Sequence, residues 1–164
     1  MKSVSIYTDG ACIGNPGPGG YGVILVFDKH RKQLSGGYRL TTNNRMELIA
    51  AIRGLDALKE PCQVQIISDS QYLVESMEKG WVKRWKANNW CRNKKEKAEN
   101  QDLWIEILNF CDHHTVQFVW VRGHNGHTEN EQCDTLASAA ARLSDLPKDD
   151  GYEKPCPPLQ IELY

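Results

Sequence analysis

The order of strand and helix patterns along this chain is compatible with few folds. Three runs of β-type residues come first, at roughly 3–9, 21–27 and 33–40, and the short connections between them predict antiparallel pairing. Helical patterns follow at 45–59, 70–79, 81–87, 101–111 and 129–143, interrupted by two further strands at 64–68 and 116–121. Because helical crossovers join parallel strands, these later strands should run parallel to the first. We therefore expect an α/β fold, a mixed five-stranded sheet flanked by helices.

The segment 10–22 separates the first two strands and is dominated by Gly, Pro and Asn. This composition predicts a loop over the whole segment. The segment lacks the Gly-Lys-Ser/Thr sequence of a phosphate-binding P-loop, and its prolines have no backbone N–H to donate. We interpret it as a conformationally demanding turn beside Asp9 rather than as a nucleotide site.

The chain has 164 residues, 40% of them hydrophobic, which suits one domain with its own core. Its longest apolar run, 23–27, is far shorter than the ~20 residues of a membrane span, and the N-terminus lacks the apolar stretch of a secretory signal. The six cysteines form no Cys-x-x-Cys pair, so we expect reduced thiols in the cytoplasm and no structural zinc. Four of the seven prolines follow residue 143. We therefore expect a monomer with one domain over 1–143 and a proline-rich, irregular tail over 144–164.

Two of the predicted strands end at an acidic residue, Asp9 and Asp69. As ends of parallel neighbours, these carboxylates should lie side by side at the carboxyl edge of the sheet, where ligands of α/β proteins usually bind. Glu47 shares a helical face with small residues that permit close packing on the sheet, and Asp134 lies early in the last helix. Each acid alone fits a solvated cap or strand end, but together they predict a cluster. Clustered carboxylates repel one another unless cations neutralise them, and such oxygen ligands suit Mg²⁺ or Mn²⁺.

A strongly basic segment lies in the middle of a chain whose net charge is only −1. Residues 79–97 contain eight Lys and Arg against one Glu, whereas the rest of the chain contains 12 basic and 20 acidic residues. Cations beside Trp81, Trp85 and Trp90 suit a nucleic acid, because phosphates bind the cations and sugars or bases pack on the indole rings. The alternatives are a solvated basic face and, for Trp81 and Trp85 on one side of a helix, burial in the core.

His124 lies between Gly123 and Gly126, where glycine permits motion. A mobile imidazole beside a metal site suits proton transfer or release of product. His127 lies three residues further on, which leaves open a zinc-dependent hydrolase that uses both histidines. A surface or purely structural histidine is the other alternative.

Short motifs are distributed over about residues 1–143: Tyr7-Thr8-Asp9-Gly10, Gly14-Asn15-Pro16-Gly17-Pro18-Gly19-Gly20, Thr42-Asn43-Asn44-Arg45-Met46-Glu47, Ser68-Asp69-Ser70-Gln71-Tyr72, Gly123-His124 and Cys133-Asp134. In order and spacing they closely resemble those of the type 1 ribonuclease H of bacteria. The resemblance implies the ribonuclease H fold, with sheet order 3-2-1-4-5. It also implies Mg²⁺-dependent, largely sequence-independent cleavage of the RNA strand of RNA/DNA hybrids, by two metal ions, to 5′-phosphate and 3′-hydroxyl ends.

The resemblance further implies roles for individual residues. The metal ligands would be Asp9, Glu47, Asp69 and Asp134, and His124 would assist turnover. The minor groove, where RNA 2′-hydroxyls are exposed, would be contacted by Cys12, Asn15, Asn43, Asn44 and Gln71, and a DNA phosphate would bind at Thr42 and Asn43. The basic protrusion, residues 79–97, would hold the DNA strand with Trp81, Lys83, Arg84, Trp85, Lys86 and Trp90. The tail after about residue 145 is longer and richer in proline than the family pattern.

Three other functions stay open at this point. The first is a module that binds hybrid duplexes without cleavage, against which the complete set of carboxylates argues, since a pure binder gains nothing from negative charge facing phosphates. The second is a metal-dependent nuclease or strand-transfer enzyme acting on DNA. The asparagines and Gln71 argue against it, because they favour readout of ribose. The third is the zinc-dependent hydrolase described above.

Overall fold

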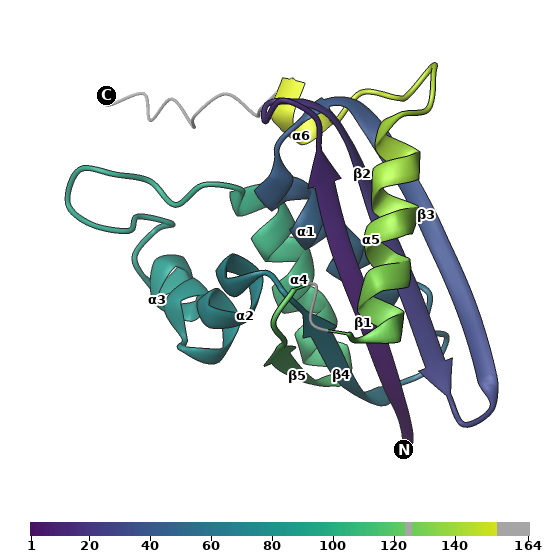
Figure 1. Cartoon of the computed structure of the whole chain (residues 1–164). Helices are drawn as coiled ribbons and strands as arrows, with labels where there is room; N and C mark the ends of the chain where they lie inside the picture. The colour runs from purple at the N-terminus through teal and green to yellow at the C-terminus, as the bar shows by residue number, and fades with distance from the viewer. Residues whose placement is uncertain (124–125, 154–164) are drawn as a thin grey trace.

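The computed structural model describes residues 1–123 and 126–153 (Figure 1). Its strands are β1 (Lys2–Cys12), β2 (Gly17–Phe27), β3 (His30–Thr41), β4 (Cys62–Ser68) and β5 (Thr115–Trp120). Its helices are α1 (Asn43–Asp56), α2 (Gln71–Glu78), α3 (Trp81–Ala87), α4 (Gln101–His113), α5 (Thr128–Ala141) and α6 (Asp150–Glu153). Every strand and helix expected from the sequence is present, most with ends shifted by a few residues.

The five strands form one mixed sheet in the order β3-β2-β1-β4-β5. β1, β2 and β3 pair antiparallel, whereas β4 and β5 run parallel to β1. The predicted meander, the parallel crossovers and the strand order are thus confirmed. In the parallel part Tyr7 pairs with Ile67, so Asp9 and Asp69, two residues further along, reach the same carboxyl edge of the sheet.

Helices cover both faces of this sheet (Figure 1). α5 packs against β1, β2 and β3, while α1 packs on the opposite face against β1 and β2, with α4 behind it. Because α1 lies between the sheet and another helix, it is buried on nearly all sides. The fully buried side chains Ile6, Leu48, Ile66 and Trp104 belong to this part of the core. The core therefore holds α1 rigidly against the middle of the sheet.

The loop predicted over residues 10–22 is wrong for most of that length. β1 continues to Cys12 and β2 begins at Gly17, so only residues 13–16 lie between the strands. In β2 glycine serves packing: a Cβ at Gly22 would lie 2.3 Å from the carbonyl oxygen of Cys133 in α5. The missing side chain lets α5 lie directly on β2. Composition alone cannot separate such a strand from a loop, because both require glycine.

The irregular tail expected from residue 144 begins instead with a segment, residues 144–153, that packs on the domain. The backbone N–H of Arg39 in β3 donates to the carbonyl of Pro147 at 2.8 Å. The Arg39 side chain also pairs with Glu153 in α6 at 2.9 Å. Residues 144–149 have no helix or strand, as expected for an irregular segment, and the domain boundary at residue 143 stays a prediction. Residues 154–164 of the predicted tail lie outside the described residues.

A buried ion pair explains why the segment packs. Asp149 accepts a hydrogen bond from the hydroxyl of Thr41 and pairs with Arg45 of α1, both at 2.7 Å, and each member of this pair has a side chain only 4% exposed. Arg45 also pairs with Asp102 at the start of α4 at 2.7 Å. Burial by itself lowers the pKa of Arg45, but hydrogen bonds to the two carboxylates raise it above its ordinary value. The guanidinium therefore stays charged and needs both partners.

The cysteines of the described part are Cys12, Cys62, Cys91, Cys111 and Cys133, all of them free thiols. Burial raises the pKa of Cys111 to about 11 and that of Cys133 to about 12, so both stay protonated at neutral pH. Among the helices of residues 1–123 and 126–153, none has the length and apolar character needed to cross a membrane.

Replacing Asp149 with alanine should lower the free energy of unfolding by about 3 kcal/mol, because the buried Arg45 loses a charged partner. Urea unfolding at neutral pH measures the change. The control is Glu60→Ala, which removes a half-exposed pair with Lys2 and should change stability little. Equal losses in the two variants would contradict the expected weight of the buried pair.

Candidate active site

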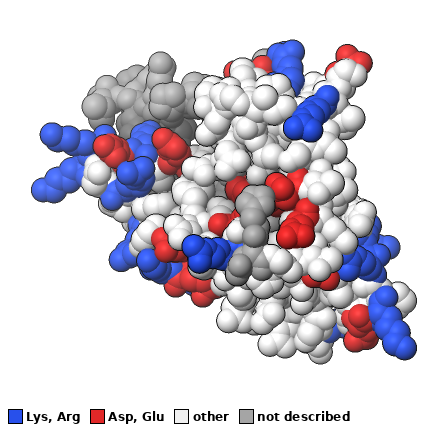
Figure 2. Space-filling model, viewed as in Figure 1, with Lys and Arg blue, Asp and Glu red and all other residues white. Residues whose placement is uncertain are grey.

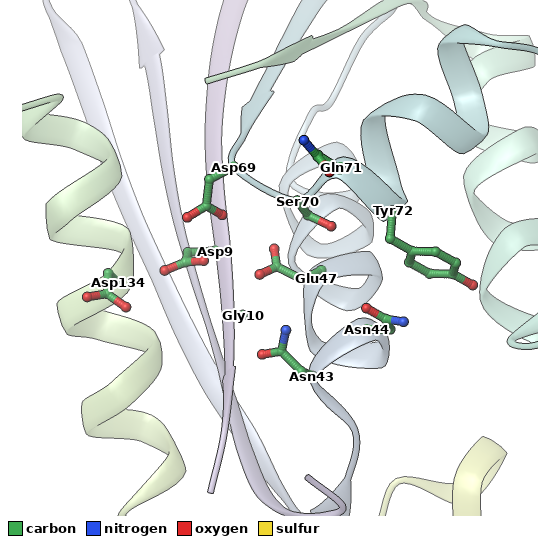
Figure 3. Close-up of a pocket in the computed structure, with 10 residues that line it drawn as sticks. All are labelled: Asp9, Gly10, Asn43, Asn44, Glu47, Asp69, Ser70, Gln71, Tyr72 and Asp134. Atoms are coloured by element: carbon green, nitrogen blue, oxygen red, sulfur yellow. The ribbon is translucent and has the colours of Figure 1, made fainter. Parts of the chain in front are cut away.

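Three carboxylates converge at the carboxyl edge of the sheet (Figure 3). Asp9 belongs to β1, Glu47 to α1, and Asp69 to the turn between β4 and α2. Each contributes an oxygen that lies within 4.8 Å of the others. Asp9 and Glu47 are buried, and Asp69 is half-buried. The structure thus brings together the two strand-end acids and the helical acid that the sequence pattern singled out.

Glycine at position 10 lets α1 approach β1 closely enough for this grouping. A Cβ on Gly10 would lie 2.5 Å from the backbone nitrogen of Glu47 and 2.6 Å from the carbonyl carbon of Met46, far inside van der Waals contact. Any side chain at this position would push α1 away from the sheet and Glu47 away from Asp9.

Asp134 approaches from the other side, on α5 (Figure 3). Gly22, the residue that keeps α5 close to β2, pairs with Asp9 across β1 and β2. Since paired residues face the same side of a sheet, Asp9 points toward α5. Asp134 lines the same cavity as the other three acids, but within the described part of the chain it is not a member of the 4.8 Å group.

Burial and mutual repulsion oppose ionisation of the two buried acids. Burial raises the pKa of Asp9 to about 8, and Asp69 and Asp134 add to the shift. Burial, followed by the charges of Asp9 and Asp69, raises the pKa of Glu47 well above its ordinary value. The site therefore retains protons near neutral pH, and a divalent cation would replace them.

The donor set fits a hard divalent cation. The Oε2 atom of Glu47 is buried and has no hydrogen-bond partner among the described residues, a situation that costs about 1–3 kcal/mol. The group consists of carboxylates, with neither histidine nor cysteine among its described members. Mg²⁺ and Mn²⁺ prefer oxygen ligands, and their charge offsets the repulsion between the acids. The residues present thus suit Mg²⁺ better than zinc.

The acids line a cavity of about 410 Å³, and residues from the first turns of two helices line it with them (Figure 3). Asn43 and Asn44 begin α1 and Gln71 begins α2. These three residues, to which the resemblance assigned contacts with the minor groove, all line the cavity. Amide side chains and carboxylates therefore border the same cavity.

Three residues without a role predicted from the sequence also line the cavity: Gly10, Ser70 and Tyr72. The hydroxyl of Tyr72 accepts hydrogen bonds from Asn100 at 3.1 Å and from Trp104 at 3.2 Å, so its ring is held as a fixed wall. The motif Ser68-Asp69-Ser70-Gln71-Tyr72 could have indicated Ser70 and Tyr72, because they alternate in it with Asp69 and Gln71, which were predicted site residues.

The remaining residues expected at the substrate surround the start of α1. Thr42 is the N-cap of α1, and its hydroxyl oxygen accepts from the backbone N–H of Arg45 at 3.2 Å. The side-chain oxygen of Asn15 accepts from the backbone N–H of Asn43 at 2.9 Å, which ties the loop 13–16 to this helix. Cys12 contacts the carbonyls of Gly17 and Thr41 at 3.5 Å and does not line the cavity.

Comparison with known proteins assigns the family. The family model described as RNase H matches residues 1–142. A ribonuclease H of Syntrophus aciditrophicus is 63% identical over 93% of this chain and 88% of its own length. The chain belongs to the ribonuclease H family. The resemblance drawn from the motifs is thus confirmed, and the protein is an enzyme of this family.

Solved structures agree with this ribonuclease H fold. LC9-RNase H1, a type 1 RNase H with the type 2 active-site motif, has a TM-score of 0.75 and 34% identity over 86% of this chain and 72% of its own. LC11-RNase H1, solved in complex with an RNA/DNA hybrid, has a TM-score of 0.66 and 24% identity over 84% of this chain and 96% of its own. At that identity, the second likeness shows the fold alone.

In this ribonuclease H the basic segment lies on α3 and the loop after it, at the left of Figure 1. Figure 2 shows Lys and Arg side chains gathered there, while Asp and Glu side chains gather in the middle of the same face. Lys83, Arg84 and Lys86 are exposed on α3. Positive and negative charge are therefore segregated on one surface.

The tryptophans of this segment are half-buried, so burial accounts for part of each indole. Trp85 packs edge-on against Trp104, with ring centroids 6.2 Å apart. A second cavity, of about 520 Å³, is nonetheless lined by Trp81, Arg84, Trp85, Asn88, Cys91, Arg92 and Asn93. The core interpretation thus applies in part to Trp85. Trp81 and Trp85 both line the second cavity, and ligand binding by their rings stays a prediction.

His124 lies outside the described residues, so its role in turnover stays a prediction. Gly123 immediately precedes it and lies against the carboxylate group: a Cβ there would be 2.7 Å from the Oδ2 atom of Asp69.

The metal-free enzyme should lose stability as the pH rises from about 4 to about 8. Asp9 has a pKa of about 8 in the fold against an ordinary value of 3.8, so the folded protein retains a proton that the unfolded chain releases, and folding weakens with rising pH. Thermal unfolding in EDTA across this range measures the trend. Asp9→Asn should flatten the trend and raise the melting temperature at the alkaline end. A variant that keeps the parent's full pH dependence would contradict the assignment.

Proposed function

We propose that this enzyme is an endonuclease that hydrolyses the RNA strand of RNA/DNA hybrids with Mg²⁺, or Mn²⁺ as a substitute, by a two-metal mechanism. The observation that supports this most is the group formed by Asp9, Glu47 and Asp69, with its unpartnered Glu47 oxygen, in a cavity bordered by amides. The family supports a ribonuclease, and LC11-RNase H1, which has the same fold, was solved with an RNA/DNA hybrid. We further propose that it acts as a monomer in the cytoplasm.

Asp9, Glu47, Asp69 and Asp134 would hold the metal. The chemistry that two bound Mg²⁺ ions supply is activation of the attacking water and stabilisation of the 3′ oxygen that leaves. The packing at Gly10 keeps Glu47 close to Asp9, so these ligands need little rearrangement. In-line attack at the phosphate leaves a 5′-phosphate and a 3′-hydroxyl. His124 would transfer a proton during turnover.

Recognition of the hybrid needs no contact that distinguishes one base from another. Asn15, Asn43, Asn44, Gln71 and Cys12 would contact the minor groove, where amide groups can both donate to and accept from RNA 2′-hydroxyls. Since every ribonucleotide has this hydroxyl, cleavage would be largely independent of sequence.

The DNA strand would be held at two places. Thr42 and Asn43 would bind a DNA phosphate at the start of α1, because their hydroxyl and amide groups can donate to it and the positive end of the helix dipole favours an anion. The exposed cations of α3, together with Trp81, Trp85 and Trp90, would bind the same strand further along the duplex. The acidic site would then receive a polyanion whose repulsion is offset by the protrusion and the bound metal.

Cleavage of an end-labelled RNA/DNA duplex, beside matched RNA/RNA and DNA/DNA duplexes, tests the proposal. With Mg²⁺ we expect cutting of the hybrid's RNA strand alone, and none with excess EDTA. Hybrid binding without cutting under every metal tried would indicate a binding module, and cutting of the DNA duplex a DNA nuclease. Activity with zinc but not with Mg²⁺ would indicate the zinc-dependent hydrolase.

In the same assay Asp69→Asn should nearly abolish cleavage, because an amide has the shape of a carboxylate but is a poor Mg²⁺ ligand. Circular dichroism should show that the variant keeps its fold. Cleavage at the parent's rate would exclude Asp69 as a metal ligand.

Replacing Lys83, Arg84 and Lys86 together with glutamine should weaken hybrid binding about tenfold or more at low salt, and less at high salt, because phosphate contacts release counterions. Fluorescence anisotropy with EDTA present measures binding without cleavage. The matched control neutralises three exposed lysines outside the protrusion, Lys29, Lys32 and Lys59. Equal losses in the two triple variants would make the effect one of net charge rather than of the protrusion.

A further inference from the structure

Asp69 lies just beyond the end of the sheet. β4 ends at Ser68, whose partner on β5 is Trp120, and α2 begins at Gln71. Asp69 therefore occupies a turn, whereas Asp9 lies within a strand and Glu47 within a helix. Of the three carboxylates, that of Asp69 depends most on local contacts for its position.

Three hydrogen bonds hold this turn. The N–H of Val121 donates to the carbonyl of Ser68 at 2.9 Å, and the N–H of Ser70 donates to the hydroxyl oxygen of Ser68 at 3.0 Å. The indole N–H of Trp120 donates to the carbonyl of Asp69 at 3.0 Å. The third bond is made to Asp69 itself, by a side chain from the neighbouring strand.

Trp120 contributes little to the core. It is 44% exposed, whereas Trp104 is completely buried. Gly123, shortly after β5, also lies against the Asp69 side chain. A Cβ on Gly123 would collide with the Oδ2 atom of Asp69. The main chain and the carboxylate of Asp69 are thus both bounded by this part of the molecule, although β5 supplies none of the carboxylates.

We propose that Trp120 is a positioning residue for metal binding: its indole N–H holds the Asp69 carbonyl so that the Asp69 carboxylate stays within reach of Asp9 and Glu47. This inference rests on the proposed metal-dependent function. A cation that meets preformed ligands binds more tightly than one that must first order them. Losing the N–H lets the turn relax and weakens cation binding, while the hybrid contacts on α1 and α3 stay in place.

The test is Trp120→Phe, which keeps an aromatic ring but lacks the donor. Titration calorimetry of the substrate-free protein should show an Mg²⁺ dissociation constant raised by about two- to tenfold, the range expected for one hydrogen bond. Hybrid affinity in EDTA should be unchanged. Ile105→Ala, at another exposed apolar residue (38% exposed), is the control and should bind Mg²⁺ like the parent. An unchanged Mg²⁺ affinity in Trp120→Phe would overturn the proposal, and Trp120→Leu gives the same comparison if phenylalanine is not accommodated.

A double-mutant cycle separates positioning from a general structural effect. In protein with Asp69→Asn, Trp120→Phe should cause no further loss of Mg²⁺ affinity, because both changes act through the same ligand. Additive losses would overturn the positioning role. If Asp69→Asn alone left Mg²⁺ affinity intact, the proposed metal site itself would be wrong, so the two failures are distinguishable.

Discussion

The active site depends on close backbone packing that forces like charges together. Gly10 lets α1 approach β1, and Gly22 lets α5 approach β2, so that Glu47 and Asp134 reach Asp9 from opposite sides. The acids oppose this arrangement, as the raised pKa values of Asp9 and Glu47 show. The core formed by α1, α4 and the sheet supplies the stability that offsets the repulsion. The protein thus holds a cluster of carboxylates, which favours bound cations, beside its buried core.

Positive and negative charges are also separated over the surface of the protein. Residues 79–97 hold a large excess of Lys and Arg, while the acids of the site lie in the middle of the same face. A nucleic acid would be attracted by the protrusion and would meet negative charge where its backbone is cut. That combination suits the proposed function, in which the carboxylates would hold a metal whose charge offsets their repulsion of the substrate phosphate. The net charge of −1 conceals this segregation.

The sequence predicted the elements well where periodicity and composition agree. The apolar spacing of α1 and the alternation in β1 led to the right structure, and chain order led to the sheet topology. Prediction failed where the same residue type occurs in two different structural roles. Gly20 and Gly22 serve helix packing within a strand, although the composition of this segment indicated a loop. Asp149 lies within the predicted proline-rich tail, but it pairs with the buried Arg45 more than one hundred positions earlier in the chain, a contact that no local pattern shows.

The sequence by itself predicted which residues would bear the chemistry, because acids at strand ends, the basic segment and the motifs are local features. The family could be recognised from those motifs, as the family comparison confirms. Only the tertiary structure decided how close the carboxylates lie, which of them are buried, and that Tyr72 and Ser70 line the same cavity. It also decided that an indole of β5 binds the main chain of Asp69. These properties depend on distances between segments far apart in the chain, which packing sets and local composition does not.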